Sequence, residues 1–449
     1  MGEYKSMVEA PTGLLGSIPE HWECKKIGSL FSERKTKVSD ADYPPLSVTK
    51  LGIVPQLANA AKSDSGDNRK LVCSGDFVIN SRSDRKGSCG VSELAGSVSL
   101  INIVLTPRNS WDNKYVHYLM RSQSFSEEYY HYGRGIVADL WTTRYSEMKN
   151  ILLPVPPHDE QEQIVRFLDW KVSGINKLIN IKKKEIKKVT ELKKTVVNEA
   201  VTRGLNPNVP MKDSGVEWLG DIPSHWKTYR CKYLFSERDE RSIEGKEQHL
   251  SMSQKYGLVP DTILDERRML SESYAGGKIC YENDLVLNRL KAHLGVFSLA
   301  PQMGVISPDY TVLIPRIERI IPAYAEAVLK SQKCRRELRV RVKGVTEGFW
   351  RLYTDSFNTI VLPVPPVEEQ KSIMDEIKLF EEKTANYISV ILKEVEVLHE
   401  LRNKLISDVV TGQIDVRDIE VPEFEFVDEI EDESDKDTDE ENDNVDEEE

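Results

Sequence analysis

Positively charged residues gather in two loops that each follow a short hydrophobic segment. The segments are Phe77–Asn80 and Leu285–Asn288, and the loops read NSRSDRKGSCG and NRLKAHLG. The candidate residues are Arg82, Arg85 and Lys86 in the first loop and Arg289, Lys291 and His293 in the second. Cationic side chains neutralise phosphates and donate hydrogen bonds to base edges. The pattern predicts contact with nucleic acid in each loop, and a solvated loop without a ligand is the alternative.

Further cations occupy other matching positions. Lys50 and Lys255 lie in one pair of loops, whereas Gly133-Arg134-Gly135 matches Lys343-Gly344, with Arg351 after Trp350. Glycine lets a backbone approach a phosphate closely. The additional candidate contacts are therefore Lys50, Lys255, Arg134, Lys343 and Arg351. For the aromatic neighbours Trp141 and Trp350, burial in a core is expected over stacking on bases.

Motifs that would indicate catalysis do not occur. The sequence contains neither a GxxxxGK[ST] phosphate loop nor an HExxH zinc motif, and its eight histidines are dispersed. It also has no [ND]PP[YF] stretch of the amino-methyltransferase kind. Pro308-Asp309 could open a nuclease signature, but the ExK strings at Glu185–Lys187 and Glu376–Lys378 lie in predicted helices. We therefore predict no catalytic residue and no metal ligand in this chain.

The sequence segments that must position these residues occur twice in the chain. The stretch IPEHWECKKIGSLFSER at Ile18 recurs as IPSHWKTYRCKYLFSER at Ile222, 204 positions later. LPVPP occurs at Leu153 and again at Leu362, 209 positions later. The register drifts by only five residues between these two matches. A period of this size is a whole domain with its connector, so the repeat predicts two similar domains.

Each half combines short strands with helices. Phe77–Asn80 and Leu285–Asn288 are expected strands that follow turn signals. A helix is expected near Tyr115–Tyr130 and near Ala323–Val340, with Pro322 in the first turn of the second. A further strand leads into the proline clusters at Pro154–Pro157 and Pro363–Pro366, which should end the sheet as rigid exits. The pattern indicates an α+β protein with two mixed domains.

A long helix is expected after each proline cluster. From Glu160 to Arg203 there is no proline, and apolar residues alternate at spacings of four and three, as in a coiled-coil seam. Ile388 to Val409 repeats this spacing. A helix of 44 residues would be about 66 Å long and would need a partner for its apolar stripe. Because Lys177–Lys194 is rich in lysine and Glu368–Glu400 in glutamate, the two helices are expected to pair. They are joined through a globular domain, so they are expected to pack antiparallel.

Charge is distributed unevenly along the 449 residues. From Glu423 to Glu449 the net charge is −16, and subtracting this from the total of −13 leaves +3 for the rest. Such a tail is expected to be disordered; it would serve solubility or imitate DNA. Six dispersed cysteines without a CxxC pair fit a reducing cytoplasm. No apolar run is long enough for a membrane span and no leader opens the chain, so a cytoplasmic location is expected.

The order of the motifs resembles the specificity subunits of type I restriction-modification systems. The resemblance covers about residues 9–415 and is carried by GVEWLGDIPSHW, LPVPPHDEQEQI and their repeats, although PTGLLGSIPEHW has Leu14-Leu15 in place of Glu217-Trp218. It implies two target recognition domains that each read half of a bipartite double-stranded DNA site. It also implies that the helices set the gap and dock methylation subunits, two being expected, which restriction subunits join. S-adenosylmethionine, ATP and Mg²⁺ would belong to those partner subunits, and none to this chain.

The resemblance divides the chain into five parts. They are 1–157 for the first recognition domain, 158–205 for the first spacer helix, 206–366 for the second domain, 367–418 for the second spacer helix, and 419–449 for an acidic disordered tail. The two halves would be related by a pseudo-two-fold axis. The alternative function is a two-headed protein-interaction scaffold, which would show no preferred DNA sequence. An enzyme active alone would methylate or cleave DNA as the purified chain.

Overall fold

The chain folds into two compact units. The computed structural model describes residues 2–11, 16–50, 52–57, 66–82, 87–108, 111–134, 141–253, 256–263, 274–343 and 350–430. Unit 1 takes Met1–Lys184 and the chain from Leu392 onward, and unit 2 takes Glu185–Ile391. The long helices α5 (His158–Arg203) and α9 (Val367–Val410) each begin in one unit and end in the other. The fold is α+β, and no described helix is long and apolar enough to cross a membrane.

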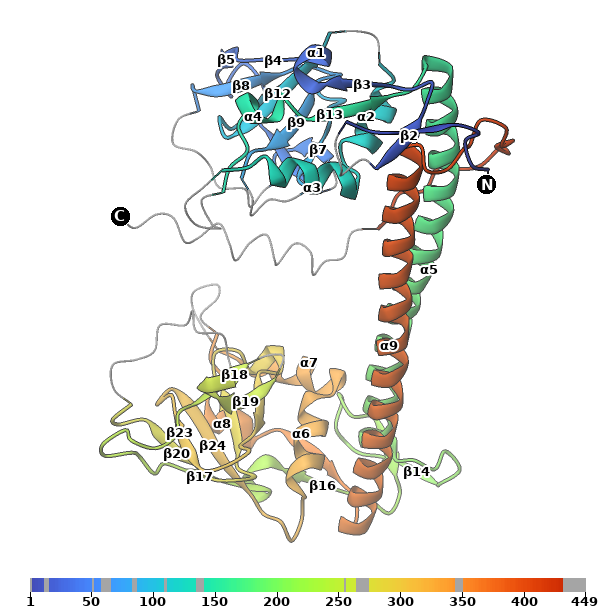
Figure 1. Ribbon diagram of the computed structural model, residues 1–449. Helices are drawn as coiled ribbons and strands as arrows, with labels where there is room; N and C mark the ends of the chain where they lie inside the picture. The colour runs from blue at the N-terminus through green and yellow to red at the C-terminus, as the bar shows by residue number, and fades with distance from the viewer. Residues whose placement is uncertain are drawn as a thin grey trace. The chain divides into compact units, whose positions relative to one another are not determined.

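Unit 1 contains a four-stranded antiparallel sheet of order β10-β9-β12-β4 (Figure 1). Its strands are β4 (Phe31–Glu33), β9 (Phe77–Asn80), β10 (Cys89–Val91) and β12 (Asn102–Pro107). The other strands are β1 (Met7–Glu9), β2 (Ser17–Pro19), β3 (Glu23–Lys26), β5 (Lys37–Val38), β6 (Leu46–Thr49), β7 (Gly52–Pro55), β8 (Arg69–Val72), β11 (Gly96–Val98) and β13 (Leu152–Val155). The short helices are α1 (Ile27–Leu30), α2 (Asn113–Leu119), α3 (Gln123–His131) and α4 (Tyr145–Met148).

Unit 2 repeats this sheet in the order β22-β21-β24-β17. Its strands are β17 (Phe235–Arg238), β21 (Leu285–Asn288), β22 (Phe297–Leu299) and β24 (Tyr310–Pro315). Around them lie β14 (Met211–Asp213), β15 (Asp221–Pro223), β16 (Lys227–Arg230), β18 (Leu250–Ser253), β19 (Gly257–Pro260), β20 (Lys278–Cys280), β23 (Gly304–Ile306) and β25 (Val361–Val364). The helices are α6 (Pro322–Lys330), α7 (Gln332–Arg341) and α8 (Thr354–Asn358), with the 3₁₀ turns η3 (Cys231–Tyr233), η4 (Asp261–Ile263) and η5 (Ala292–Leu294). Both predicted strands, β9 and β21, are confirmed.

The repeated FSER motif has the same role in both units. Arg34 Nε donates a 2.8 Å hydrogen bond to Asp76 Oδ2 in unit 1, and Arg238 Nε does so to Asp284 Oδ2 in unit 2. Each aspartate is almost fully buried beside its sheet. Burying a carboxylate without a partner costs roughly several kcal/mol. Each buried aspartate therefore requires the arginine of the FSER motif.

The opening and closing motifs of each half bind one another. His21 Nε2 lies 2.8 Å from Glu160 Oε2 at the start of α5, and His225 Nε2 lies 2.8 Å from Glu369 Oε2 at the start of α9. The neighbouring Trp22 and Trp226 are buried in the cores of their units. The repeated motifs IPxHW and EQ therefore form a tertiary contact, which attaches the start of α5 to unit 1 and the start of α9 to unit 2.

Each helix expected around residues 115–130 and 323–340 is in fact two helices. The hydroxyl of Ser122 accepts a hydrogen bond from Phe125 N at the start of α3, and that of Ser331 accepts one from Cys334 N at the start of α7. A serine in this position starts a new helix because it satisfies an amide that the preceding turn leaves unpaired. Pro322 stands in the first turn of α6, as predicted.

The strands end within the proline clusters, as predicted: β13 stops at Val155 before Pro156-Pro157, and β25 stops at Val364 before Pro365-Pro366. The first proline of each cluster, however, still belongs to its strand. Pro154 lies inside β13 opposite Cys24, and Pro363 lies inside β25 opposite Thr228. Each of these strands belongs to a two-stranded ribbon. Proline is tolerated in such a strand because its missing N–H can face away from the one partner.

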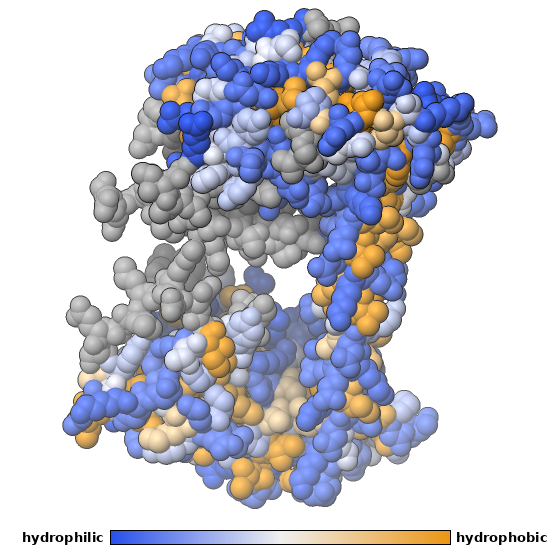
Figure 2. All heavy atoms as spheres, viewed as in Figure 1, coloured by the Kyte–Doolittle hydropathy of each residue, from blue (hydrophilic) through white to orange (hydrophobic). Residues whose placement is uncertain are grey.

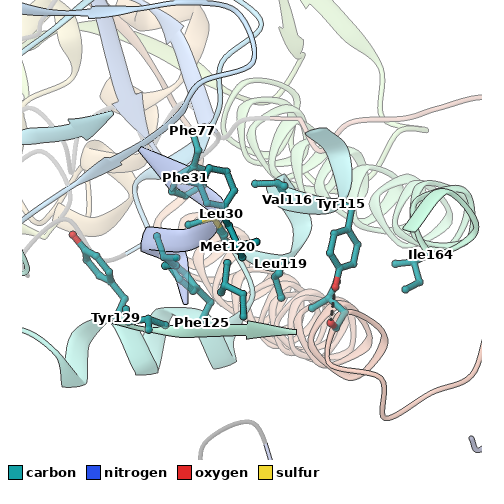
Figure 3. Close-up of a cluster of buried hydrophobic side chains, with 14 of the residues drawn as sticks. Leu30, Phe31, Phe77, Tyr115, Val116, Leu119, Met120, Phe125, Tyr129 and Ile164 are labelled. Atoms are coloured by element: carbon teal, nitrogen blue, oxygen red, sulfur yellow. Dashed lines mark hydrogen bonds between the residues drawn. The ribbon is translucent and has the colours of Figure 1, made fainter. Parts of the chain in front are cut away.

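The ends of the long helices complete both cores. In unit 1 the apolar cluster around Leu30, Phe77 and Phe125 includes Ile164 from α5 together with Val409 and Val410 from α9 (Figure 3). In unit 2 the cluster includes Ala200 and Val201 from α5 and Ile373 and Ile377 from α9. The helices are therefore integral to the two units, whereas the sequence had suggested separate spacers between domains.

The two long helices pair in antiparallel fashion within each unit (Figure 1). In unit 1 Lys182 Nζ lies 2.8 Å from Glu394 Oε2, and in unit 2 Lys193 Nζ lies 3.0 Å from Glu381 Oε1. Seam residues Leu168, Val172, Ile175 and Ile179 of α5 are buried. The expected complementarity of lysine and glutamate is confirmed at these two pairs.

The start of the expected disordered tail is ordered. Residues 419–430 run in extended form beside α5. Ser173, Asn176 and Asn180 bond to their backbone, because amide and hydroxyl groups on one helix stripe can replace the missing sheet partners of an extended chain. Residues 431–449 lie outside the described part of the chain.

Candidate nucleic-acid interface

Two of the cationic loops of unit 1 meet through Thr142. Its backbone exchanges two 3.0 Å hydrogen bonds with Arg134 and also forms an antiparallel bridge with Arg82. Thr143 N donates to Ser81 O at 3.0 Å, which ties the end of β9 to the same segment. Arg82 and Arg134 are both exposed. Side chains that are 52 positions apart in sequence thus share one surface, as a joint phosphate contact requires.

An aromatic pair lies next to this surface. Tyr130 and Trp141 stack with ring centroids 5.7 Å apart, and Trp141 Nε1 donates to Tyr130 O at 3.0 Å. A Cβ atom on Gly133 would lie 1.9 Å from Trp141 Nε1. Gly133 is therefore required for the close packing of Trp141, and Gly135 lies outside the described residues. Trp141 is half-buried.

A pocket opens between β9, α3 and the stacked pair. Its lining includes Asn80, Ser81, Arg82, Arg121, Ser126, Tyr129, Tyr130, Trp141 and Thr143. Hydrogen-bonding groups and aromatic faces are the two means by which proteins contact bases. The pocket thus combines both at the place where the cationic loops of unit 1 converge.

Arg121 is a residue of this pocket that the sequence did not single out. Its guanidinium lies 2.7 Å from His117 Nε2 and donates to the carbonyl of Lys50. Burial, with Arg121 and Lys114, lowers the pKa of His117 to about 3, so the imidazole is neutral and can accept. Burial also lowers the pKa of Arg121, which still carries its charge at neutral pH because it starts so high. Arg121 therefore holds the loop of exposed Lys50 against α2.

Unit 2 brings three predicted residues together in the corresponding way. Lys343 and Arg351 exchange two backbone hydrogen bonds of 2.9 Å, and Leu352 N donates to Arg289 O at 2.9 Å. The Arg289 side chain donates to Asp309 O at 2.6 Å, and Arg351 Nη2 lies 3.9 Å from Asp309 Oδ2. Asp309 thus orients two arginines, which gives it a structural role that differs from the nuclease ligand considered from its sequence.

His293 is not expected to act as a cation. Its ring meets that of Trp350 edge to face at 5.6 Å, and burial, Arg339 and Arg335 lower the pKa of His293. A neutral, half-buried imidazole supports the packing of Trp350 more than the binding of a phosphate. Lys291, two residues earlier, is exposed. Arg85, Lys86 and Lys255 lie outside the described residues.

Helix α7 adds a basic surface that was not predicted from the sequence. Arg335, Arg336 and Arg339 are exposed on it, and two of them act electrostatically on His293. The signal was present as five basic residues in the ten of QKCRRELRVR, opposed by one glutamate. The corresponding helix α3 reads QSFSEEYYH and carries two glutamates instead. Of these two, Glu127 is exposed and Glu128 is buried, so α3 lacks the basic surface of α7.

The described residues show no metal centre. Within the ranges given above, no three His, Cys, Asp or Glu side chains lie close enough to hold a metal ion. All six cysteines are free, and the four with strongest burial have raised thiol pKa values because burial disfavours the thiolate.

Comparison with known proteins shows that the chain is similar to proteins named as type I restriction enzyme specificity subunits. The type I restriction enzyme MjaVIII specificity subunit of Methanocaldococcus jannaschii is 21% identical over 428 residues, which cover 90% of this chain and 95% of that one. The MjaX protein of the same organism, also named as such a specificity subunit, is 22% identical over 442 residues, 90% and 96% of the two chains. No protein-family model matches the chain.

A solved structure shares the fold. A chain from a study of complex assembly and conformational transition of the type I R-M system superposes with a TM-score of 0.60. The two chains are 14% identical, and the match covers 88% of this chain and 99% of the other. The arrangement of elements in this chain is thus one already seen in a protein of that system.

Proposed function

We infer that the chain belongs to the specificity subunits of type I restriction enzymes and recognises a bipartite sequence in double-stranded DNA. Unit 1 would read one half of the site and unit 2 the other. The observation that carries this proposal is a shared scaffold with unlike loops. β9 and β21 end in Asn80 and Asn288 at equivalent places, yet the residues that follow, and helices α3 and α7, differ in size and charge.

We assign Arg82, Arg121 and Arg134 to the contact surface of unit 1, and Arg289, Lys343 and Arg351 to that of unit 2. Backbone bonds hold all of these residues except Arg121 before DNA arrives, and Arg121 is held through its side chain by His117 and the carbonyl of Lys50. Pre-ordered donors lose less entropy on binding and discriminate better between bases. The exposed arginines of α7 would contribute phosphate contacts, which carry affinity but not sequence.

The long helices would set the gap between half-sites and dock the partner subunits. Apolar side chains stay exposed on both helices: Leu178, Ile181 and Leu192 on α5, and Leu379, Val390, Leu392, Val397 and Leu401 on α9. Figure 2 shows hydrophobic residues at the surface over the helices. Exposed apolar stripes on long helices favour docking of another protein. We propose methylation subunits, two in number, as that protein, with restriction subunits joining them.

The chemistry would lie in the partner subunits. We propose that S-adenosylmethionine, ATP and Mg²⁺ bind there, and that this chain is non-catalytic and only directs adenine methylation or restriction. A pseudo-two-fold relation of the halves would then present the same docking surface to each methylation subunit.

Exchange of the DNA-recognition region of unit 1 tests the proposal. Residues 24–150 are replaced by the equivalent region of a relative, and the methylated motif of host DNA is determined by methylation-sensitive sequencing. One half of the motif should change while the other half stays the same. A change in both halves would contradict the assignment of one half-site to each unit. Absence of any preferred sequence, at any salt concentration, would favour the scaffold alternative.

A further inference from the structure

The segment Glu423–Ile430, here termed the C-terminal segment, is held by one face of the long helices. On α5 this face consists of Ser173, Asn176, Asn180 and Lys183, and on α9 of His399 and Arg402. We refer to these six residues, four on α5 and two on α9, as the α5 face. All of them, and the segment itself, belong to unit 1.

Two residues of the α5 face bond to the segment's backbone in both directions. Ser173 Oγ donates to Glu425 O at 2.9 Å and accepts from Val427 N at 2.8 Å. Asn180 donates to Asp428 O at 2.7 Å and accepts from Ile430 N at 2.8 Å. These contacts recognise an extended backbone, as the edge of a sheet does, and they do not depend on side-chain identity.

One carboxylate provides side-chain recognition. Glu429 accepts from Lys183 Nζ at 2.9 Å and from Arg402 Nη1 at 2.6 Å. His399 Nε2 lies 3.2 Å from the same carboxylate but is not aligned as a hydrogen-bond donor. Glu429 is only 17% exposed. Charge-assisted bonds of this kind are about twice as strong as neutral ones.

The spacing of the helix matches that of an extended peptide. Ser173 to Lys183 spans ten residues of helix, about 15 Å. Glu425 to Ile430 spans five residues of extended chain, about 17 Å. Helix α5 and the C-terminal segment run in the same direction. Successive polar side chains of α5 therefore meet successive backbone N–H and C=O groups of the segment. The positions on α9 that correspond to Ser173, Asn176 and Asn180, by the offset of 209, are Glu382, Ala385 and Ser389, so the full set of three does not recur.

Apolar burial contributes little to this contact. The core of unit 1 takes residues of the C-terminal region only as far as Val421. Beyond it, Phe424, Phe426 and Ile430 are 38%, 49% and 46% exposed. A segment whose large apolar side chains face water, and which is held by polar bonds, is expected to detach more easily than core elements.

We propose that the α5 face is a binding site for an extended acidic peptide, and that the chain's own C-terminal segment is the ligand that occupies it. The segment is tethered, so its effective concentration is high, and it excludes other acidic peptides from this face. The inference does not rest on DNA recognition. A second chain with an extended acidic segment would bind here only after displacing the tethered one.

The test uses full-length chains and a fluorescent peptide with the sequence of residues 419–430. In a Glu429→Ala chain the tethered segment is weakened while the α5 face is intact. This chain should bind the peptide at least about 10-fold more tightly than the wild type, where the tethered segment competes. Adding Asn176→Ala and Asn180→Ala should abolish that binding. Glu425→Ala is the matched control, because it removes one negative charge from an exposed side chain and should behave as the wild type.

Equal binding by wild type and Glu429→Ala, or binding by neither, would refute the proposal. Hydrogen exchange provides a second measurement that needs no peptide. The amides of Val427 and Ile430 should exchange faster in Glu429→Ala, while those of α5 and the unit 1 core stay protected. If core and segment amides opened together, the segment would be a part of the core and the α5 face no separate site.

Discussion

The hydroxyl of Tyr115 donates a 3.3 Å hydrogen bond to the carbonyl of Val410, 295 residues later in the chain. The dashed line in Figure 3 joins Tyr115 to the end of α9. In unit 2 the hydroxyl of Tyr324 bonds in the same way to Val201 O, at 3.0 Å. Adding the repeat offset of 209 to Tyr115 and Val201 gives Tyr324 and Val410. Each unit is therefore completed by a helix end that belongs to the other half of the sequence.

Substitutions at these helix ends should destabilise the unit in which they pack, not the half of the sequence that contains them. Val410→Ala should lower the free energy of unfolding of unit 1 by about 1.5–3 kcal/mol, because it leaves a cavity at a fully buried position. Val201→Ala is the matched variant and should weaken unit 2 instead. Hydrogen exchange read by mass spectrometry distinguishes the units. Loss of protection in the same unit for both variants would contradict the crossed arrangement.

Removal of Arg121 should affect one half-site only. Arg121→Met keeps the volume but loses the bonds to His117 and to the Lys50 loop, so the contact surface of unit 1 should loosen. With methylation subunits present, affinity for the specific duplex should fall roughly 10-fold, about 1.4 kcal/mol. Discrimination should relax at base pairs of one half-site, as measured with duplexes substituted singly along the motif. Arg144→Met, at an exposed arginine of the same unit, serves as control and should leave both values unchanged.

The basic face of α7 should determine much of the salt dependence. A chain with Arg335→Gln, Arg336→Gln and Arg339→Gln should bind DNA with a log K against log salt slope reduced by about 2–3, because each phosphate contact releases counterions. The sequence preference should be retained. Lys227→Gln, Lys232→Gln and Lys246→Gln remove the same charge from exposed positions of unit 2 outside α7. An equal change of slope in both triple variants would indicate net charge as the cause.

Acid should release the C-terminal segment. Burial raises the pKa of Glu429, but hydrogen bonds from Lys183 and Arg402 and the charges of Arg402 and His399 outweigh it and leave the pKa lowered. A lowered folded-state pKa means that docking is fully supported above the ordinary carboxyl range and is lost as pH falls through the lowered value. Amide chemical shifts of Val427 and Ile430, followed from pH 7 downward, should report this release. In Glu429→Gln the transition should be absent; an unchanged transition would assign it to another group.

The sequence by itself determined the repeat, and with it most of the fold. Ile18–Arg34 and Ile222–Arg238 predicted two similar domains, and the strands Phe77–Asn80 and Leu285–Asn288 were found at those bounds. Periodicity also predicted the pairing of α5 with α9, because an apolar stripe of that length needs a partner. Local patterns of this kind are visible in sequence because the interacting groups are close along the chain or recur at a fixed period.

Only the tertiary structure decided which distant residues meet. Arg82 reaches Arg134 through Thr142, Arg121 reaches the Lys50 loop, and Asp309 orients Arg289 and Arg351. The order of the C-terminal segment was hidden for the same reason: its charge predicts disorder, and it is ordered by polar groups on α5 about 250 positions earlier. Composition reports what a segment can do alone, whereas a hydrogen bond or ion pair across the fold depends on where the chain returns.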